Sequence, residues 1–151
     1  MSGVIEVSRA TTAGWAPGAQ RLTEWAGAAL GRRRGEICIR IVGPRESRRL
    51  NALYRQRDYA TNVLSFPAGP VPGASVGDAP LGDIAICATV VAREARAQGK
   101  TLAAHWAHMV VHGVLHLCGY DHVDDDDARR MERRERAILG QLGFADPYDG
   151  H

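Results

Sequence analysis

The sequence is poor in cysteine and nearly devoid of lysine. Its 151 residues include three cysteines, Cys38, Cys87 and Cys118, which are widely spaced and form no C-x-x-C pair. An odd and scattered set of thiols argues against a disulfide scaffold and fits a reducing compartment. The first fifteen residues also lack the basic and apolar segments of a secretory signal. We therefore expect a cytoplasmic protein.

Charge is absent from Thr101 to Tyr120, a stretch of twenty residues without Asp, Glu, Lys or Arg. Its length would suit a membrane span. It also carries four histidines, so we predict a buried helix and no membrane association. The length of the chain, with 45% hydrophobic and 24% charged residues, predicts a single soluble domain over residues 1–151.

The net charge of +2 hides an asymmetry along the chain. Residues 1–60 hold eleven arginines and five acids, whereas residues 61–151 hold eight basic and twelve acidic residues. The guanidinium group is a planar fork that suits phosphate, so the basic part is a candidate surface for RNA or DNA. A solvated face of an arginine-rich protein explains the same pattern equally well.

Three histidines near the end of the uncharged stretch have the spacing of a metal site. His112 and His116 are four residues apart and would share one face of a helix. Gly119 can end that helix in a left-handed turn, which would bring His122 back as a third ligand. Three protein ligands leave the fourth position of a zinc ion open, as in catalytic sites. We therefore predict one Zn²⁺ per chain, bound by His112, His116 and His122.

The glutamate that would make this site a peptidase is missing. The order H-x-x-x-H-x-x-G-x-x-H has the spacing of the metzincin peptidases, in which a glutamate after the first histidine acts as general base. Gly113 stands in that place here. The pattern favours zinc-assisted hydrolysis of another bond, with a metallopeptidase-like hydrolase as the alternative. Without a metal, the histidines would be hydrogen-bonded residues of a core helix.

Hydrophobic periodicity predicts alternating helices and short strands. We expect strands at 4–7, 36–42, 63–66 and 81–87, and helices at 20–30, 46–54, 89–98, from a cap at Thr101 to the turn at Gly119, and at 125–142. In the second helix, Leu50, Leu53 and Tyr54 are expected to face the core. Residues 68–80 are crowded with Pro and Gly and predict a flexible loop.

Several polar positions have two interpretations. Asp83 interrupts an apolar strand, and is either a solvent-facing residue of an edge strand or a carboxylate bonded to a site residue. His105 and His108 share the face of the two helical ligands but lie too far along the helix to bind the same ion. Packing is preferred for His105, whereas packing, support of the site and substrate contact all stay open for His108. The acidic run 124–127 is interpreted as the first turn of the last helix.

Gly113 is a further open question, because glycine inside a helix costs about 1 kcal/mol relative to alanine. We expect it to permit close approach of another backbone, or of substrate, beside the metal.

The segment that contains the three histidines resembles the signature of the YbeY family of bacterial endoribonucleases, the rRNA maturation factors. The matching residues are His112-Gly113-x-Leu115-His116-Leu117-x-Gly119-Tyr120-Asp121-His122, with further agreement at Asn51 to Pro67, at Leu81 to Ile86, and at Met131 and Glu135 of the last helix. The resemblance covers about Leu50 to Tyr148. One small departure is Asp127, where the family often has glutamate.

This resemblance implies an α+β fold with a small mixed four-stranded sheet, about five helices and the zinc site at the end of a central helix. It implies zinc-dependent cleavage of single-stranded RNA in 16S rRNA 3′-end maturation and ribosome quality control. The expected partners are ribosomal RNA, the small ribosomal subunit and ribosome-assembly proteins. In that family the arginine at the position of Arg55 is catalytic, and the histidines at His112, His116 and His122 bind the metal.

Two points of mechanism stay open at the level of sequence. The attacking group is either water or the 2′-hydroxyl of the RNA. The zinc itself is either catalytic or, in a ribosome-associated binding protein, mainly structural.

Overall fold

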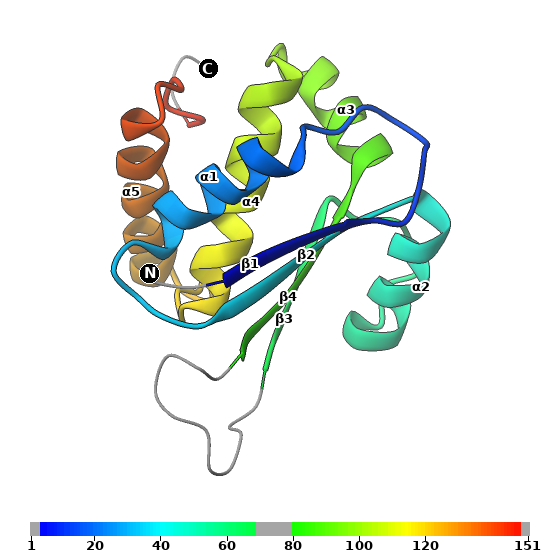
Figure 1. Cartoon of the computed structure of the whole chain (residues 1–151), viewed down its shortest axis with the longest axis horizontal. Coiled ribbons are helices and arrows are strands. Elements are labelled where there is room, and N and C mark those ends of the chain that lie inside the picture. Colours follow the sequence, from blue (N-terminus) through cyan, green and yellow to red (C-terminus); the bar gives the residue numbers. More distant parts are fainter. Residues whose placement is uncertain (1–3, 69–79, 149–151) are drawn as a thin grey trace.

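A mixed four-stranded sheet lies at the centre of the protein, with the strand order β1-β2-β4-β3 (Figure 1). The computed structural model describes residues 4–68 and 80–148, so most of the predicted loop at 68–80 lies outside the described residues. The strands are β1 (Val4–Arg9), β2 (Glu36–Val42), β3 (Val63–Pro67) and β4 (Pro80–Cys87). β1, β2 and β4 are parallel, and β3 pairs antiparallel with β4. The predicted mixed sheet is confirmed.

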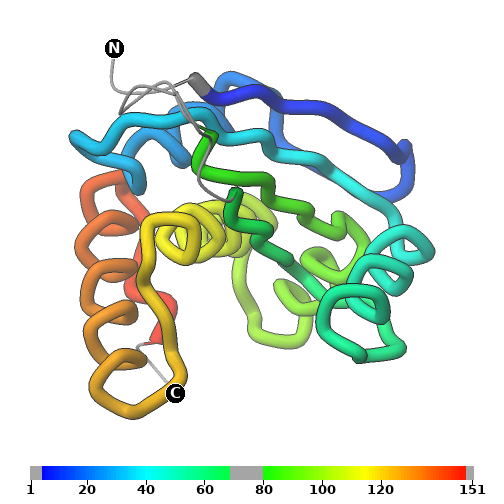
Figure 2. The backbone as a smooth tube through the Cα atoms, turned by 90° about the horizontal axis from the view of Figure 1, so that it is seen from below, coloured from blue at the N-terminus to red at the C-terminus, as the bar shows by residue number. Residues whose placement is uncertain are grey.

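Within the described residues, five helices pack around this sheet, which confirms the predicted α+β class. They are α1 (Ala19–Leu30), α2 (Pro44–Arg55), α3 (Ala88–Gln98), α4 (Leu102–Leu117) and α5 (Asp125–Gln141). α1 and α4 cover one face of the sheet, and α5 packs against α4. α2 contacts β4 and α3 and, as Figure 2 shows, lies well apart from α4 and α5.

The alternation of side chains along β4 separates two hydrophobic clusters. Ile84 and Ile86 point into the larger cluster between the sheet and the α1 and α4 helices. Ala85 and Cys87 point to the opposite face, into a smaller cluster that includes Leu64. This two-residue period is what a sheet covered on both faces requires.

Asp83 is exposed on β4, which lies between β2 and β3. The side chain therefore faces solvent, as one interpretation expected, but the expectation of an edge strand is wrong.

The α4 helix is buried on nearly all sides, which explains why its sequence lacks charged residues. It packs against β3 and β4 on one side and against α1, α3 and α5 on the others. A helix surrounded in this way needs apolar residues all round. Thr101 caps it as predicted, with its hydroxyl accepting a 3.1 Å hydrogen bond from the Ala104 N–H. None of the helices described here is long and apolar enough to cross a membrane.

The buried face of α2 differs from the prediction. Leu53 and Tyr54 were expected to face the core, but their side chains are 62% and 59% exposed. Leu50 packs at the margin of the smaller cluster. The buried positions are instead the polar residues Ser47 and Asn51, each 2% exposed. α2 therefore turns a polar face inward, because what it contacts there is the backbone of the loop that follows it.

Gly113 also differs from its expected role. A Cβ atom at this position would lie 3.0 Å from the Ile84 side chain and 3.3 Å from that of Val63. The Ser65 hydroxyl donates a 3.0 Å hydrogen bond to the Gly113 carbonyl. The close approach that glycine permits is thus made by side chains of β3 and β4, and not by another backbone or a substrate.

Candidate metal centre

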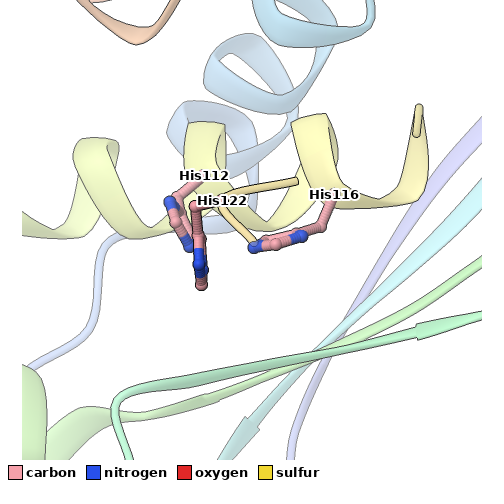
Figure 3. Close-up of side chains that lie close together, drawn as sticks. All are labelled: His112, His116 and His122. Atoms are coloured by element: carbon pink, nitrogen blue, oxygen red, sulfur yellow. The ribbon is translucent and has the colours of Figure 1, made fainter. Parts of the chain in front are cut away.

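The turn after α4 brings His122 back towards the helix. Gly119 adopts a left-handed conformation, with φ at +99°. The Tyr120 N–H donates to the Leu115 carbonyl, and the Gly119 N–H donates to that of His116, both at 3.0 Å. These paired bonds form a Schellman motif, which ends a helix and reverses the chain. His122 consequently lies beside the last two turns of α4 (Figure 3).

The three histidines form one cluster. Their potential ligand atoms all lie within 4.8 Å of one another. The ring centroid of His116 is 4.7 Å from that of His112 and 5.0 Å from that of His122. Burial of the ring is the main cause that lowers the pKa of His116 to about 4, and electrostatic repulsion by His112 and His122 is the next. This ring is therefore neutral at pH 7 and has a free lone pair. Neutral imidazoles suit zinc, and also copper, iron or nickel, so the donor set fits a metal ion without selecting one.

A hollow of about 430 Å³ opens in front of this cluster. His112, His116 and His122 line it from one side. Asn62, which directly precedes β3, and Ser65 of β3 also line it. Arg55, in the last turn of α2, lines the same hollow and is exposed. The four residues predicted for the site are therefore brought together, although they come from three separate segments of the chain.

Glu135 also belongs to this site, although the sequence indicated it only as part of the family resemblance. It lies on the buried face of α5 with Met131, Ile138 and Leu139, and is 1% exposed. Its carboxylate lies 3.3 Å from Nδ1 of His112 and 2.7 Å from Nε2 of His108. The Tyr148 hydroxyl donates to the other carboxylate oxygen at 2.9 Å. The signal in the sequence was a carboxylate within an apolar stripe, because a buried charge requires partners.

The charge of Glu135 fixes how these groups share their protons. Burial alone would raise the pKa of Glu135, but hydrogen bonds from His108 and His112 outweigh it and lower this pKa to about 2. An ionised carboxylate only accepts hydrogen bonds, so the histidine nitrogens beside it must donate. His112 therefore carries its proton on Nδ1, and Nε2 keeps the lone pair that a metal needs.

The other histidines of α4 support this arrangement or the packing near it. His108, whose role was left open, bonds to Glu135 and belongs to the surroundings of His112. His105 is 2% exposed, as the packing interpretation expected, and its Nε2 lies 2.8 Å from a carboxylate oxygen of Glu94. Glu94 also accepts a 3.0 Å hydrogen bond from the Asn62 amide. The buried His105 thus holds Glu94, and Glu94 holds Asn62, which lines the hollow.

We expect Glu135→Gln to weaken metal binding by about 10- to 100-fold, the usual effect of losing a carboxylate that orients a histidine ligand. Glutamine removes the charge that makes His112 donate from Nδ1, while it keeps the size of the side chain. The dissociation constant for zinc, measured by competition with a chromophoric chelator, gives the effect. Glu132→Gln, on a more exposed part of the same helix, is the matched control. An affinity equal to that of the parent protein would contradict this role for Glu135.

Comparison with a family model and comparison with individual proteins identify the same family. The family model described as Endoribonuclease YbeY matches residues 8–143. A protein of Stutzerimonas stutzeri (strain A1501), named Endoribonuclease YbeY, is 55% identical over 137 residues, which cover 89% of this chain and 85% of that protein. One of Pseudomonas entomophila (strain L48) with the same name is 52% identical over 146 residues, or 95% of this chain and 92% of that protein.

The fold also has a counterpart among solved structures. A protein of Thermotoga maritima, known from its solution structure, matches with a TM-score of 0.53 and 23% identity, covering 97% of this chain and 100% of that chain. This likeness concerns the fold alone. The family model, in contrast, spans most of the sequence, and both curated relatives share more than half of their aligned residues with it. The chain therefore belongs to the family described as endoribonuclease YbeY.

Proposed function

We propose that this chain is a zinc-dependent endoribonuclease that cleaves single-stranded RNA. The observation that carries the proposal is one hollow lined by three clustered imidazoles and an exposed arginine. The curated relatives, which are named endoribonucleases, support the choice of RNA as substrate.

The residues of the hollow divide the work between metal binding and phosphate binding. His112, His116 and His122 would hold the zinc ion, with Glu135 orienting His112. A zinc ion held there would supply Lewis-acid chemistry, which polarises a phosphoryl oxygen or acidifies a water molecule. Arg55 would bind a phosphate through two of its nitrogens and stabilise the negative charge that develops on the phosphoryl oxygens in the transition state.

The cellular role that we propose is 16S rRNA 3′-end maturation and ribosome quality control in the cytoplasm. The partners would be ribosomal RNA, the small ribosomal subunit and ribosome-assembly proteins. The exposed arginines Arg45 and Arg49 of α2 offer phosphate-binding charge for such an assembly.

A cleavage assay combined with metal analysis tests the activity. Purified protein would be incubated with a single-stranded RNA, with its deoxy counterpart and with casein, and its zinc content would be measured on the same sample. We expect cleavage of the RNA alone and about one zinc per chain. Products with a 2′,3′-cyclic phosphate would assign the attack to the 2′-hydroxyl. Products with a 5′-phosphate and a free 3′-hydroxyl would assign it to water, because attack by the 2′-hydroxyl always expels the 5′-oxygen. Degradation of casein with intact RNA would contradict the proposal.

The peptidase alternative is disfavoured by the surroundings of Gly113 as well as by its identity. A side chain at this position would point at Ile84 and Val63, where no space is left for a carboxylate. We expect Gly113→Glu to lower the free energy of unfolding by at least about 3 kcal/mol, because it overpacks the core and buries an unpaired charge. It would create no peptidase.

Urea unfolding followed by circular dichroism measures this loss. Gly113→Ala is the control, and a smaller loss is expected since one methyl group requires only small shifts of Ile84 and Val63. A Gly113→Glu protein as stable as the parent, with activity on casein, would restore the peptidase hypothesis.

A further inference from the structure

A second hollow of about 510 Å³ lies beside the metal centre. It is lined by Asn51 and Arg55 of α2 and by three residues of the following loop, Arg57, Tyr59 and Thr61. Arg55 and Thr61 also line the first hollow. The two hollows are therefore neighbours, and Arg55 stands between them.

The loop that forms the second hollow is held firmly by the polar face of α2. The side-chain amide of Asn51 donates to the Tyr59 carbonyl at 2.9 Å, and the backbone carbonyl of Asn51 accepts from the Arg57 N–H at 3.3 Å. The Ser47 hydroxyl donates to the Thr61 carbonyl at 2.8 Å and accepts from the Thr61 N–H at 2.9 Å. Both α2 side chains are almost fully buried. These bonds fix the loop backbone before any ligand arrives, which lowers the entropy cost of binding.

The side chains that this loop presents are an aromatic ring and a positive charge. Tyr59 is 54% exposed, and Arg57, two residues earlier in the loop, is exposed as well. The acidic residue between them, Asp58, forms an ion pair with Arg48, which donates to both carboxylate oxygens at 2.7 and 3.0 Å. No ion pair joins Arg55 or Arg57 to another residue within 4–68 or 80–148. The hollow therefore carries excess positive charge around an exposed ring.

We propose that this second hollow is a nucleotide subsite for single-stranded RNA. One base stacks on Tyr59, Arg57 binds the phosphate of that nucleotide, and the strand continues past Arg55 into the metal hollow. Aromatic rings beside basic side chains are the usual means of binding single strands, because every base has a face to stack. The subsite rests on the proposed RNase function and adds a residue, Tyr59, that governs substrate affinity and length.

The test uses the metal-loaded protein and single-stranded oligomers of two to ten nucleotides. Affinity is measured by fluorescence anisotropy with 2′-O-methyl oligomers, and cleavage with RNA of the same sequences. We expect Tyr59→Ala to raise the dissociation constant and KM by about tenfold on the longer oligomers, with kcat changed less than about twofold. On oligomers too short to fill both hollows, the variant should equal the parent. Tyr59→Phe keeps the ring and should bind as the parent does.

Arg57→Ala should weaken binding of the longer oligomers and reduce the slope of log affinity against log salt by about one. Tyr54→Ala is the matched control for Tyr59, and Arg133→Ala, on α5, is the matched control for Arg57, since both control residues are exposed and line neither hollow. Both variants should leave affinity unchanged.

Three outcomes overturn the subsite: an unchanged affinity in Tyr59→Ala at every length, an equal loss at every length, or a parent protein that binds no oligomer. If the first outcome is accompanied by loss of binding to the small ribosomal subunit, the hollow is assigned to a folded partner and not to a single strand. A parent that binds the oligomers with the expected dependence on Tyr59 but never cleaves RNA supports the subsite and contradicts the RNase function. The two proposals can thus fail separately.

Discussion

Arg55→Ala is expected to lower the rate of RNA cleavage by about 10²- to 10³-fold, the scale seen when one transition-state donor is removed. The zinc content and the free energy of unfolding should stay at the parent values, because Arg55 is exposed at the end of α2 and is no metal ligand. Arg55→Lys should recover only part of the rate, since lysine restores the charge but lacks the planar fork. Single-turnover cleavage at saturating RNA measures the chemical step separately from binding.

Arg49→Ala provides the matched control for this experiment. Arg49 is also exposed on α2, but it does not line the metal hollow. Its removal should change binding slightly and leave the chemical step intact. Should Arg55→Ala cleave saturating RNA as fast as the parent, Arg55 would be one more phosphate-binding arginine, and the catalytic role would pass to another group.

His116→Ala is expected to abolish tight zinc binding, leaving less than about a tenth of the parent metal content after dialysis. The variant keeps only two imidazoles, and three protein ligands are the usual minimum for a zinc site that stays occupied. RNA cleavage should fall by at least about 10³-fold with the metal. His112 precedes the turn at Gly119 and His122 follows it, and each ring supplies only its own nitrogen, so neither can replace the missing one.

Metal analysis by mass spectrometry, beside thermal unfolding of the metal-free proteins, measures this effect. His105→Gln is the control, because His105 lies on the same helix but bonds to Glu94 outside the cluster. It should keep its zinc. If a variant without His112, His116 and His122 retains stoichiometric zinc, the ligand assignment is wrong.

The parts of the structure that could be predicted are those whose cause is local in sequence. The strand predicted at 36–42 is β2 with the same bounds, because alternating β-branched residues leave little choice of conformation. Thr101 and Gly119 end α4 where expected, since caps and left-handed turns depend on one residue and its neighbours. The histidine cluster followed from two such features, the helical period and the turn.

What could not be predicted depends on contacts between distant segments. Leu53 and Tyr54 looked like a core face, but the partner of α2 is a loop backbone, and backbone groups are satisfied by Ser47 and Asn51. The contact of Glu135 with His112 joins two helices, and only the packing of α5 on α4 creates it. Gly113 depends in the same way on Ile84 and Val63 of the sheet. In each case the residue was noticed, and its partner was unknown.

We expect RNA cleavage to require a metal held by His112, His116 and His122. The most direct measurement is cleavage of single-stranded RNA by protein stripped with a chelator and then titrated with zinc. Activity should be absent at first, rise in proportion to added zinc and level off at about one equivalent per chain. The His116→Ala protein should gain no activity over the same range. Full activity in stripped protein, or restoration by zinc in the variant, would contradict the claim.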